Sequence, residues 1–425
     1  MSQEINKNTI CAVPWMHLAF EPSGKIIPCC LTSTHKTAEV GNLNDNSLEE
    51  IWNSDRMKQM RVEMMNGIEP KICNKCFDRE KVTGESGRTY HNRDFNSVIK
   101  SIPEITLEDG TATEMKLRYW DMRFSNLCNL KCRSCGPDYS SAWVPDAKKM
   151  GSISEQDKVW NITNVDDEIN FDFLKSQIPH VEKIYFTGGE PLLMPEHWQI
   201  LDLLVEQKRF NVKISYNTNA SKLTYGGKNV LDYWKKWNPL KCEVWPSIDE
   251  IGDRAELIRA GTNWKTVEKN LIAMSELDNI ILRPGITVGA WNVFRLPEII
   301  NKFVELNIIK RNPLLGLQHN NFFINLLELP AHYHVSILPE WFRKETITKL
   351  ENFIKEFNQK YDTDLNPRFE HILYELKKPF NAIEASRFIH ITEKLDKIRN
   401  ENTFETIPEI NCIKEALNKN IIARG

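Results

Sequence analysis

The sequence lacks a membrane-spanning segment and an excess of charge of either sign. It contains no run of 18 or more apolar residues, the length that a membrane helix requires, so we expect no membrane association. The 55 Lys and Arg residues nearly balance the 58 Asp and Glu residues, and the formal net charge is −3. This balance excludes a polycation that coats phosphate backbones, and we expect no nucleic-acid partner.

Cysteine is scarce too: ten residues in a chain of 425 are too few for a disulfide scaffold. The first residues lack the basic and then apolar profile of a secretory signal peptide, so we expect the protein in the cytoplasm. In that reducing compartment, closely spaced cysteines are more often metal ligands or redox groups than disulfides. The isolated Cys242 and Cys412 lie in apolar segments and are interpreted as core residues. The other eight lie in the first third of the chain, at Cys11, Cys29, Cys30, Cys73, Cys76, Cys128, Cys132 and Cys135.

The pattern of apolar residues divides the chain into three regions. Residues 1–110 are cysteine-bearing with short elements, and the polar stretch 83–97 is predicted to be a linker or long loop. Residues 111–340 alternate strand-like runs with helical patterns. Residues 341–425 are predicted to be helical, and we interpret their apolar stripes as packing rather than chemistry.

The middle region predicts the fold class. Helical patterns separate the strand-like runs, and one of them carries Trp198, Leu201 and Leu204 on one face. Strand–helix alternation with single crossovers predicts a parallel sheet, and six such units indicate an α/β fold with a partial (βα)6 barrel. A small cysteine-rich N-terminal domain and a helical C-terminal tail complete the predicted fold. The predicted strands are residues 117–124, 183–187, 212–216, 243–247, 281–288 and 322–327.

Three cysteines follow the first predicted strand within eight residues. Cys128, Cys132 and Cys135 form a C-x3-C-x2-C run, one thiolate short of a closed zinc or iron–sulfur site. One interpretation is a zinc knuckle completed by a distant fourth ligand. The other is a 4Fe–4S cluster whose fourth iron stays open to a substrate or cofactor. The position of the run favours the cluster, because parallel sheets place their sites at the carboxyl ends of strands.

A second motif extends the pattern. Gly188-Gly189-Glu190-Pro191 follows the second predicted strand; alone, it would more often be an ordinary turn. Two adjacent glycines let the backbone approach a ligand closely, and the carboxylate of Glu190 can accept hydrogen bonds from an ammonium group. Together with the cysteine run, this motif resembles the radical S-adenosylmethionine (SAM) superfamily. The resemblance implies that Cys128, Cys132 and Cys135 hold a catalytic 4Fe–4S cluster and that residues 188–191 bind SAM.

The ends of the third and fourth predicted strands agree with the same resemblance. It implies that Ser215 and Arg259 bind the methionyl carboxylate of SAM. Taken singly, each of these polar residues is more simply a strand-end hydrogen-bonding group. Ser134 stands where the family usually has an aromatic residue, so adenine packing must use the main chain or Trp143. The SAM contacts expected from these units are Ser215, Asn217, Asn219, Ser247, Asp249 and Arg259.

The N-terminal cysteines form a second set. Pro22-Ser-Gly24 predicts a turn between two strands, which brings Cys29 close to Cys11, and Cys73 and Cys76 form a C-x2-C pair. Four such cysteines close a metal site, and a structural zinc is one interpretation.

The segment also resembles the SPASM/twitch module, whose auxiliary 4Fe–4S cluster would be held by Cys11, Cys29, Cys73 and Cys76. The module has a Pro-Cys pair whose cysteine is a ligand. Matching this pair to the sequence makes Cys29 the ligand, although Cys30 could substitute for it. Such modules usually follow the barrel, whereas this one precedes it.

The resemblance implies a radical SAM enzyme of uncertain class, oxidoreductase or transferase. Such an enzyme cleaves SAM reductively to a 5′-deoxyadenosyl radical, which abstracts a substrate hydrogen. We expect a peptide, protein or small-metabolite substrate and an external electron donor such as flavodoxin or ferredoxin. Two alternatives stay open: a radical SAM enzyme that acts on RNA or a nucleotide, and a non-catalytic, zinc-stabilised binding module.

Overall fold

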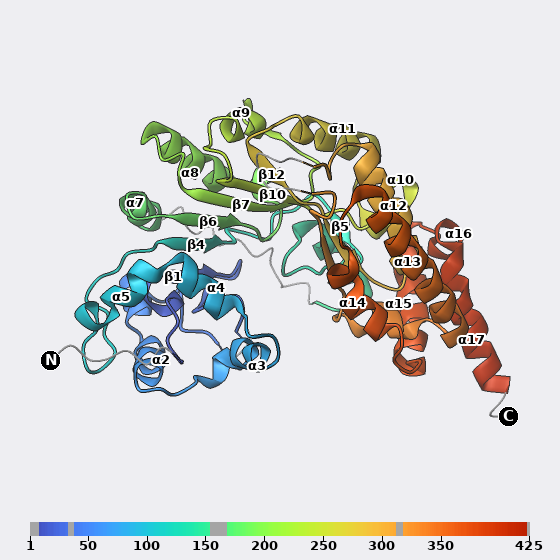
Figure 1. The fold of residues 1–425 in the computed structure, drawn as a ribbon, viewed down its shortest axis with the longest axis horizontal. Helices are drawn as coiled ribbons and strands as arrows, with labels where there is room; N and C mark the ends of the chain where they lie inside the picture. The colour runs from blue at the N-terminus through green and yellow to red at the C-terminus, as the bar shows by residue number, and fades with distance from the viewer. Residues whose placement is uncertain (1–7, 33–37, 154–167, 312–317, 423–425) are drawn as a thin grey trace. The chain divides into compact units, whose positions relative to one another are not determined.

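The computed structural model describes residues 8–32, 38–153, 168–311 and 318–422. The chain divides into two compact units. Unit 1 comprises Met1–Asn126 and Trp160–Ser215, and unit 2 comprises Leu127–Val159 and Tyr216–Gly425. Both contain strands and helices (Figure 1). The domain boundaries expected after residues 110 and 340 stay predictions.

Unit 1 contains a sheet with the strand order β7-β6-β4-β1-β2-β3. β1 runs parallel to β4, with His17 opposite Tyr119, and β4 runs parallel to β6. β1 and β2 form the predicted antiparallel hairpin, and Gly24 in its turn has a φ of +85°. The N-terminal hairpin therefore extends the predicted barrel sheet, which the sequence did not indicate. The strands are β1 His17–Phe20, β2 Lys25–Ile27, β3 Gly41–Asn42, β4 Tyr119–Met122, β6 Lys183–Phe186 and β7 Lys213–Thr218, and β7 crosses the unit boundary.

One face of this sheet is apolar because side chains alternate along each strand. Trp120 and Met122 on β4 and Ile184 and Phe186 on β6 are all buried. The opposite face carries polar groups, among them the buried Asp121. Two helices of unit 1 connect these strands in the sequence: α7 Glu168–Gln177 precedes β6, and α8 Pro195–Glu206 lies between β6 and β7. Helix α8 buries its predicted apolar stripe.

Short helices surround the N-terminal hairpin (Figure 1). The prediction of a linker or long loop over residues 83–97 is wrong, because α4 and the start of α5 occupy it. The side chain of Ser86 accepts a hydrogen bond from the Thr89 backbone, and the Thr89 side chain bonds back, which forms a capping box at the start of α4. The polar residues of this stretch are the outer faces of helices. The helices are α1 Leu48–Trp52, α2 Asp55–Met65, α3 Asn74–Thr83, α4 Gly87–Asp94 and α5 Asn96–Ile105.

In unit 2, β10 runs parallel to β12, and a separate parallel pair joins β13 to β14. The strand predicted over residues 281–288 is two strands, because Pro284 offers no backbone N–H to continue the ladder. β5 and β11 form a short antiparallel pair. The strands are β5 Lys131–Cys132, β8 Thr224–Tyr225, β9 Lys228–Asn229, β10 Cys242–Pro246, β11 Arg259–Ala260, β12 Ile280–Leu282, β13 Gly285–Val288 and β14 Phe323–Leu326.

The end of the chain is helical, as predicted, and its helices are drawn in orange and red in Figure 1. The fold is thus α/β with a large parallel sheet and a helical C-terminus. The helices of unit 2 are α6 Val144–Met150, α9 Val230–Trp234, α10 Gly252–Ile258, α11 Trp264–Ser275, α12 Leu296–Glu305, α13 Glu340–Tyr361, α14 Asn366–Glu375, α15 Ala382–Arg399, α16 Thr403–Thr406 and α17 Asn411–Ile422.

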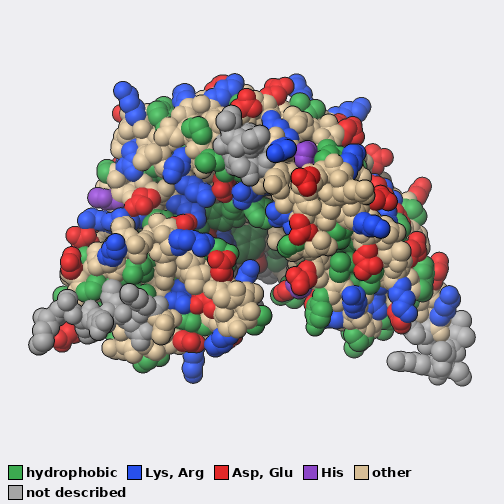
Figure 2. All heavy atoms as spheres, viewed as in Figure 1, with side chains coloured by type: hydrophobic (Ala, Val, Ile, Leu, Met, Phe, Trp, Pro, Cys, Tyr) green, Lys and Arg blue, Asp and Glu red, His purple; other side chains and the backbone are tan. Residues whose placement is uncertain are grey.

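Core and surface agree with the composition. Cys242 and Cys412 are buried, as expected of core residues. Within the described ranges, no helix combines the length and apolarity needed to cross a membrane. Figure 2 shows Lys and Arg side chains interspersed with Asp and Glu side chains over the face that it draws.

Candidate functional site

The cysteine loop of unit 2 is folded by its own hydrogen bonds. The Cys135 backbone N–H donates to the Cys132 carbonyl at 3.0 Å, and the Leu130 N–H points to the Cys128 sulfur at 3.4 Å. The Ser141 hydroxyl accepts from the Cys128 N–H at 3.2 Å. Cys132 is buried, while Cys128 and Cys135 are half-buried. These local hydrogen bonds shape the turn that carries the three cysteines.

Burial controls the ionisation of these thiols in the metal-free loop. It raises the pKa of Cys132 to about 12 and also raises the pKa of Cys135. A thiol must lose its proton to bind a metal, so cluster assembly on this loop must release protons.

Arg259 lies directly beside the cysteine loop. It is the register partner of Cys132 in the pairing of β5 with β11, and its Nη1 donates to Asp249 Oδ2 at 2.9 Å. Asp249 is buried, and its other oxygen accepts from the Thr287 backbone at 2.8 Å. Burial disfavours the charge on Arg259, but Cys132 and Asp249 raise the pKa of the guanidinium above its usual value. The site therefore holds a permanent cation next to the cysteines.

Gly261 allows this close approach. Its φ is +99°, and a Cβ atom there would lie 2.8 Å from the Asn129 carbonyl oxygen. A larger residue would push β11 away from the cysteine loop, and Arg259 with it.

Asn219, at the end of β7, also faces the loop. Its Nδ2 donates to Asn129 Oδ1 at 3.0 Å and lies 3.9 Å from the Cys128 sulfur. The Asn129 amide in turn donates to the Ser221 hydroxyl at 2.9 Å. Asn217 and Ser247 are half-buried, and the Ser247 backbone N–H donates to the Thr218 carbonyl at 2.8 Å. Unit 2 therefore brings the cysteine loop together with Asn219, Asp249 and Arg259.

The predicted glycine motif belongs to unit 1 and packs on the end of β4. Gly188 has a φ of +108°, and a Cβ atom there would lie 3.1 Å from the Cβ of Arg123. The Gly189 N–H donates to the Ser125 carbonyl at 3.2 Å. Glu190 is buried, and its Oε1 accepts from the Leu192 N–H at 3.2 Å, just after Pro191 opens a short 3-10 helix.

Ser215 is the last residue of unit 1. It is buried, and its hydroxyl has no hydrogen-bond partner among the described residues. A buried hydroxyl without a partner costs free energy, which a bound polar ligand would recover.

The N-terminal cysteines also come together, in a cavity of unit 1. Cys11, Cys29, Cys73 and Cys76 all line it, together with apolar side chains and Arg88. Cys30 does not line the cavity, and its thiol is hydrogen-bonded to Cys29 and to Asp121. Burial raises the pKa of Cys11 and of Cys73 to about 12, and Arg88 acts in the opposite direction on both.

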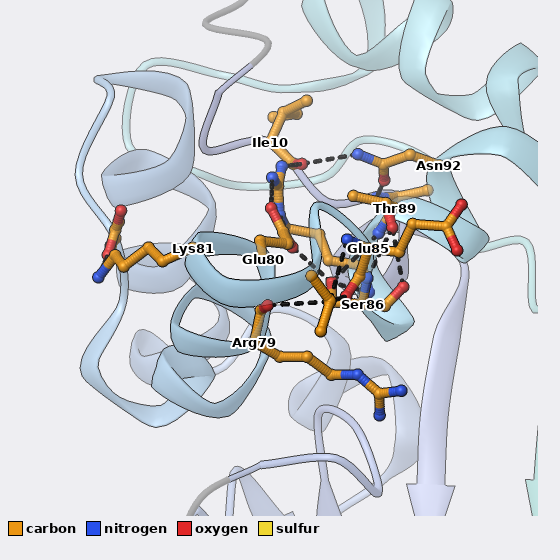
Figure 3. A network of polar contacts seen from close by, with 12 residues as sticks. Ile10, Arg79, Glu80, Lys81, Glu85, Ser86, Thr89 and Asn92 are labelled. Atoms are coloured by element: carbon orange, nitrogen blue, oxygen red, sulfur yellow. Dashed lines mark hydrogen bonds and ion pairs between the residues drawn. The ribbon is translucent and has the colours of Figure 1, made fainter. Parts of the chain in front are cut away.

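A polar network holds the segment that carries Cys11 (Figure 3). Arg88 Nη1 and Asn92 Nδ2 both donate to the Ile10 carbonyl at 2.8 Å, and Asn92 Oδ1 accepts from the Ala12 N–H at 2.9 Å. Glu80 pairs with Arg88 and accepts a hydrogen bond from Ser86. The backbone on both sides of Cys11 is therefore held by α4.

Sequence reasoning missed Arg88 and Asn92, because both lie in the stretch interpreted as a loop.

Among the described residues, no three His, Cys, Asp or Glu side chains are arranged to hold a single metal ion.

Two family models match the chain. An iron–sulfur cluster-binding domain, SPASM, matches residues 11–77, and the radical SAM superfamily matches residues 122–296. The chain carries a radical SAM domain and, N-terminal to it, a SPASM domain. These matches cover both cysteine sets and agree with the resemblance found in the sequence.

Two curated proteins are similar to this radical SAM protein over part of its length. One is the GTP 3′,8-cyclase of Aliarcobacter butzleri, 25% identical over 118 residues, which are 28% of this chain and 32% of the relative. The other is the 7,8-dihydro-6-hydroxymethylpterin dimethyltransferase of Methanocaldococcus jannaschii, 25% identical over 169 residues, which are 39% of this chain and 29% of the relative. The matches thus span less than a third of each relative.

Solved radical SAM structures are also similar. The anSMEcpe structure with bound AdoMet matches 56% of this chain and 58% of its own, with 18% identity and a TM-score of 0.39. Streptococcus suis SuiB bound to the precursor peptide SuiA matches 96% of this chain and 75% of its own, with 12% identity and a TM-score of 0.35.

The family implies a 4Fe–4S cluster with SAM, and the SPASM domain implies an auxiliary iron–sulfur cluster. The radical SAM protein offers suitable groups for both. Thiolates are the ligands that iron–sulfur clusters use, and the protein presents one set of three and one set of four. In unit 2, the Arg259 cation beside Cys132 is a group that fits the carboxylate of SAM.

Proposed function

We propose that this protein is an enzyme that cleaves SAM reductively and uses the 5′-deoxyadenosyl radical to abstract hydrogen from a peptide or a small metabolite. One observation carries the proposal: a half-buried guanidinium, Arg259, is held by Asp249 at the register position of Cys132. A cation at the edge of the three-cysteine loop can pair with the carboxylate of a ligand that binds there.

The chain's own residues bind and orient SAM. Asp249 uses one oxygen on Arg259 and the other on the Thr287 backbone, so it positions the guanidinium and has no need to touch SAM. Arg259 keeps further N–H groups that can donate to the methionyl carboxylate. Asn219, beside Cys128, is placed to contact methionine or ribose. Cys128, Cys132 and Cys135 would hold the 4Fe–4S cluster, which would supply one-electron reduction of SAM.

Unit 1 carries the other proposed SAM contacts. The buried carboxylate of Glu190 accepts the ammonium group of SAM, while Gly188 and Gly189 leave room for its approach. Ser215 donates its hydroxyl to the methionyl carboxylate, which gives that buried group its missing partner.

The N-terminal cavity serves electron transfer. Cys11, Cys29, Cys73 and Cys76 would hold a 4Fe–4S cluster with one thiolate for each iron, which would leave no iron for SAM or substrate. A cluster held by these four cysteines would supply an acceptor for the electron left on the substrate after hydrogen abstraction. A flavodoxin or ferredoxin supplies the electron that starts the cycle.

The curated relatives favour a second substrate class. Both are named for heterocyclic small molecules, GTP and a pterin. A nucleotide or pterin-like metabolite is therefore the second candidate, after a peptide.

Isotope transfer tests the proposal. Anaerobically reconstituted protein is incubated with SAM, dithionite and a deuterated candidate substrate, either a peptide or a nucleotide. We expect 5′-deoxyadenosine in every reaction and deuterium in it only with the correct substrate class. Cluster-loaded wild-type protein that forms no 5′-deoxyadenosine would contradict the proposal.

A further inference from the structure

The residue that follows Cys132 is tied to the C-terminal helices. Arg133 is only 2% exposed, although it lies in the loop between two cysteines. Its Nη2 pairs with Asp396 on α15 and with Glu401 just after that helix. A buried guanidinium between two carboxylates is a specific arrangement, because a buried charge without a partner would be strongly destabilising.

The acceptor side of this contact is itself held in place. Asp396 Oδ2 accepts from the Thr403 backbone N–H at 2.9 Å, and Oδ1 accepts from the Thr403 hydroxyl at 2.6 Å. Thr403 is the first residue of α16. The carboxylate that meets Arg133 is therefore fixed by the turn between α15 and α16.

A second contact holds the other side of Cys132. Arg399 on α15 donates from Nε to Asp146 Oδ2 at 2.7 Å, and Lys131 pairs with the same carboxylate at 3.0 Å. The Arg399 guanidinium lies 4.6 Å from the ring centre of Trp143, whose Nε1 donates to the Cys132 carbonyl at 2.7 Å. The residues before and after Cys132, and the Cys132 carbonyl, are thus all held by side chains that lie on α15, follow it or contact it.

Apolar packing completes the contact. Leu395 of α15 forms a buried cluster with Trp143 and Ala147, and Cys135 packs against this cluster. All of these residues belong to unit 2. Helix α15 therefore contacts the cysteine loop through charges on two sides and through an apolar centre.

We propose that α15 and the turn after it form a clamp, consisting of Asp396, Arg399 and Glu401, that positions the cysteine loop and sets the charge beside its cluster. The inference rests on the proposed function, because it takes the loop to hold the SAM-binding cluster. These are positioning residues: they act through Arg133 and Trp143.

The charges explain why the clamp affects the cluster. Three cationic side chains pair with three carboxylates around the loop, so the net charge of these six groups is zero. Removing one carboxylate leaves a positive charge beside Cys132, which favours the reduced cluster and raises its reduction potential. The six groups are Lys131, Arg133, Arg399, Asp146, Asp396 and Glu401.

The test compares Glu401→Gln and Asp396→Asn with Glu409→Gln in the full, reconstituted protein. Glu409 is a matched control, because it also lies in the C-terminal region and also pairs with an arginine, Arg254, outside the loop. The midpoint potential is measured by electron paramagnetic resonance for the cluster whose signal changes when SAM is added. We expect that potential to rise in Glu401→Gln and Asp396→Asn and to stay at the wild-type value in Glu409→Gln.

A second variant separates position from charge. Arg133→Lys keeps the positive charge but loses the planar fork that meets two carboxylates. We expect its potential to stay near the wild-type value, while a chelator removes iron from the SAM-responsive cluster several-fold faster. This variant keeps the inference testable if the carboxylate variants fail to fold.

The outcomes distinguish the clamp from the proposed function. Wild-type potential and chelator resistance in Glu401→Gln, Asp396→Asn and Arg133→Lys would overturn the clamp alone. A wild-type protein without any SAM-responsive cluster would overturn the proposed function and the clamp together.

Discussion

The three cysteines of the loop lie within eight residues, whereas the four that line the N-terminal cavity come from positions spread over residues 11–76. The loop is shaped by its own backbone hydrogen bonds, and its charged partners come from strand ends and from α15. The cavity exists only when the hairpin and the short helices of unit 1 have folded, and α4 holds the segment around Cys11.

This difference suggests different roles. A 4Fe–4S cluster on the three cysteines of the loop would have one open iron, and the Arg259 cation lies beside the loop. The cavity is lined by four cysteines and mostly apolar side chains, which is typical of a closed site that transfers electrons or supports the fold. Substitutions in the two sites should therefore have separable effects.

The largest expected effect comes from removing the loop thiols. In Cys128→Ala/Cys132→Ala/Cys135→Ala, iron content should fall from about eight to about four per chain, and SAM cleavage should be abolished. Iron analysis and chromatography of 5′-deoxyadenosine check this. The control is Cys242→Ala, a buried cysteine outside both sites, which should keep all the iron. Residual 5′-deoxyadenosine from the triple variant would show that the loop is not the site of cleavage.

Removing two cavity thiols should leave SAM cleavage intact. In Cys73→Ala/Cys76→Ala, we expect about four irons, normal 5′-deoxyadenosine formation with dithionite, and a large loss of product from the true substrate. Cys30→Ala is the matched control and should keep about eight irons, because Cys30 does not line the cavity. Circular dichroism must first show a native fold, since a metal site can supply folding energy. If 5′-deoxyadenosine disappears while the loop cluster remains, the separation of roles is wrong.

A smaller effect is expected from the cation beside the loop. Arg259→Gln removes a charge-assisted partner of the SAM carboxylate, which is worth about 1.5–3 kcal/mol, or roughly ten- to hundredfold in affinity. Glu190→Gln should weaken SAM binding in the same way while it still accepts from the Leu192 N–H. Equilibrium titration with SAM checks both, with Arg254→Gln as the control. If either variant bound SAM with wild-type affinity and kept its full iron content, the substituted residue would not be a SAM contact.

The smallest effect concerns the stability of unit 1. His17 Nδ1–H donates to the Tyr119 carbonyl at 2.9 Å, and burial lowers the pKa of His17 to about 3. The folded state therefore binds fewer protons than the unfolded state, whose histidine pKa is about 6.5, and stability falls as the pH drops below that value. Between pH 7 and pH 5 this loss is about 2 kcal/mol.

His17→Asn keeps a donor for the Tyr119 carbonyl but does not titrate. Denaturant unfolding of both proteins at pH 7 and pH 5 should show a smaller loss of stability in the variant. His91, whose pKa burial lowers to about 4, is present in both proteins, so its contribution cancels. An equal pH dependence in the two proteins would show that His17 is not buried in its neutral form.

The sequence predicted the elements whose signals are local. The cysteine run, the Gly-Gly-Glu-Pro turn and the strand–helix alternation are each readable within a few neighbouring residues, and the apolar stripe of α8 follows from helical periodicity. Errors occurred where local signals were misleading. The polar residues 83–97 form helices because a capping box starts α4, and Pro284 divides a single apolar run into β12 and β13.

By itself, the sequence determined that the protein is α/β and carries two separate cysteine sets, because hydrophobic period and ligand spacing are properties of neighbouring residues. Only the tertiary structure decided that β1 pairs in parallel with β4, that Cys29 rather than Cys30 lines the cavity, and that α15 contacts the cysteine loop. The contact of Arg133 with Asp396 joins residues more than 260 positions apart. Such a pairing depends on which surfaces the folded chain brings together, and no local pattern of charge or periodicity encodes it.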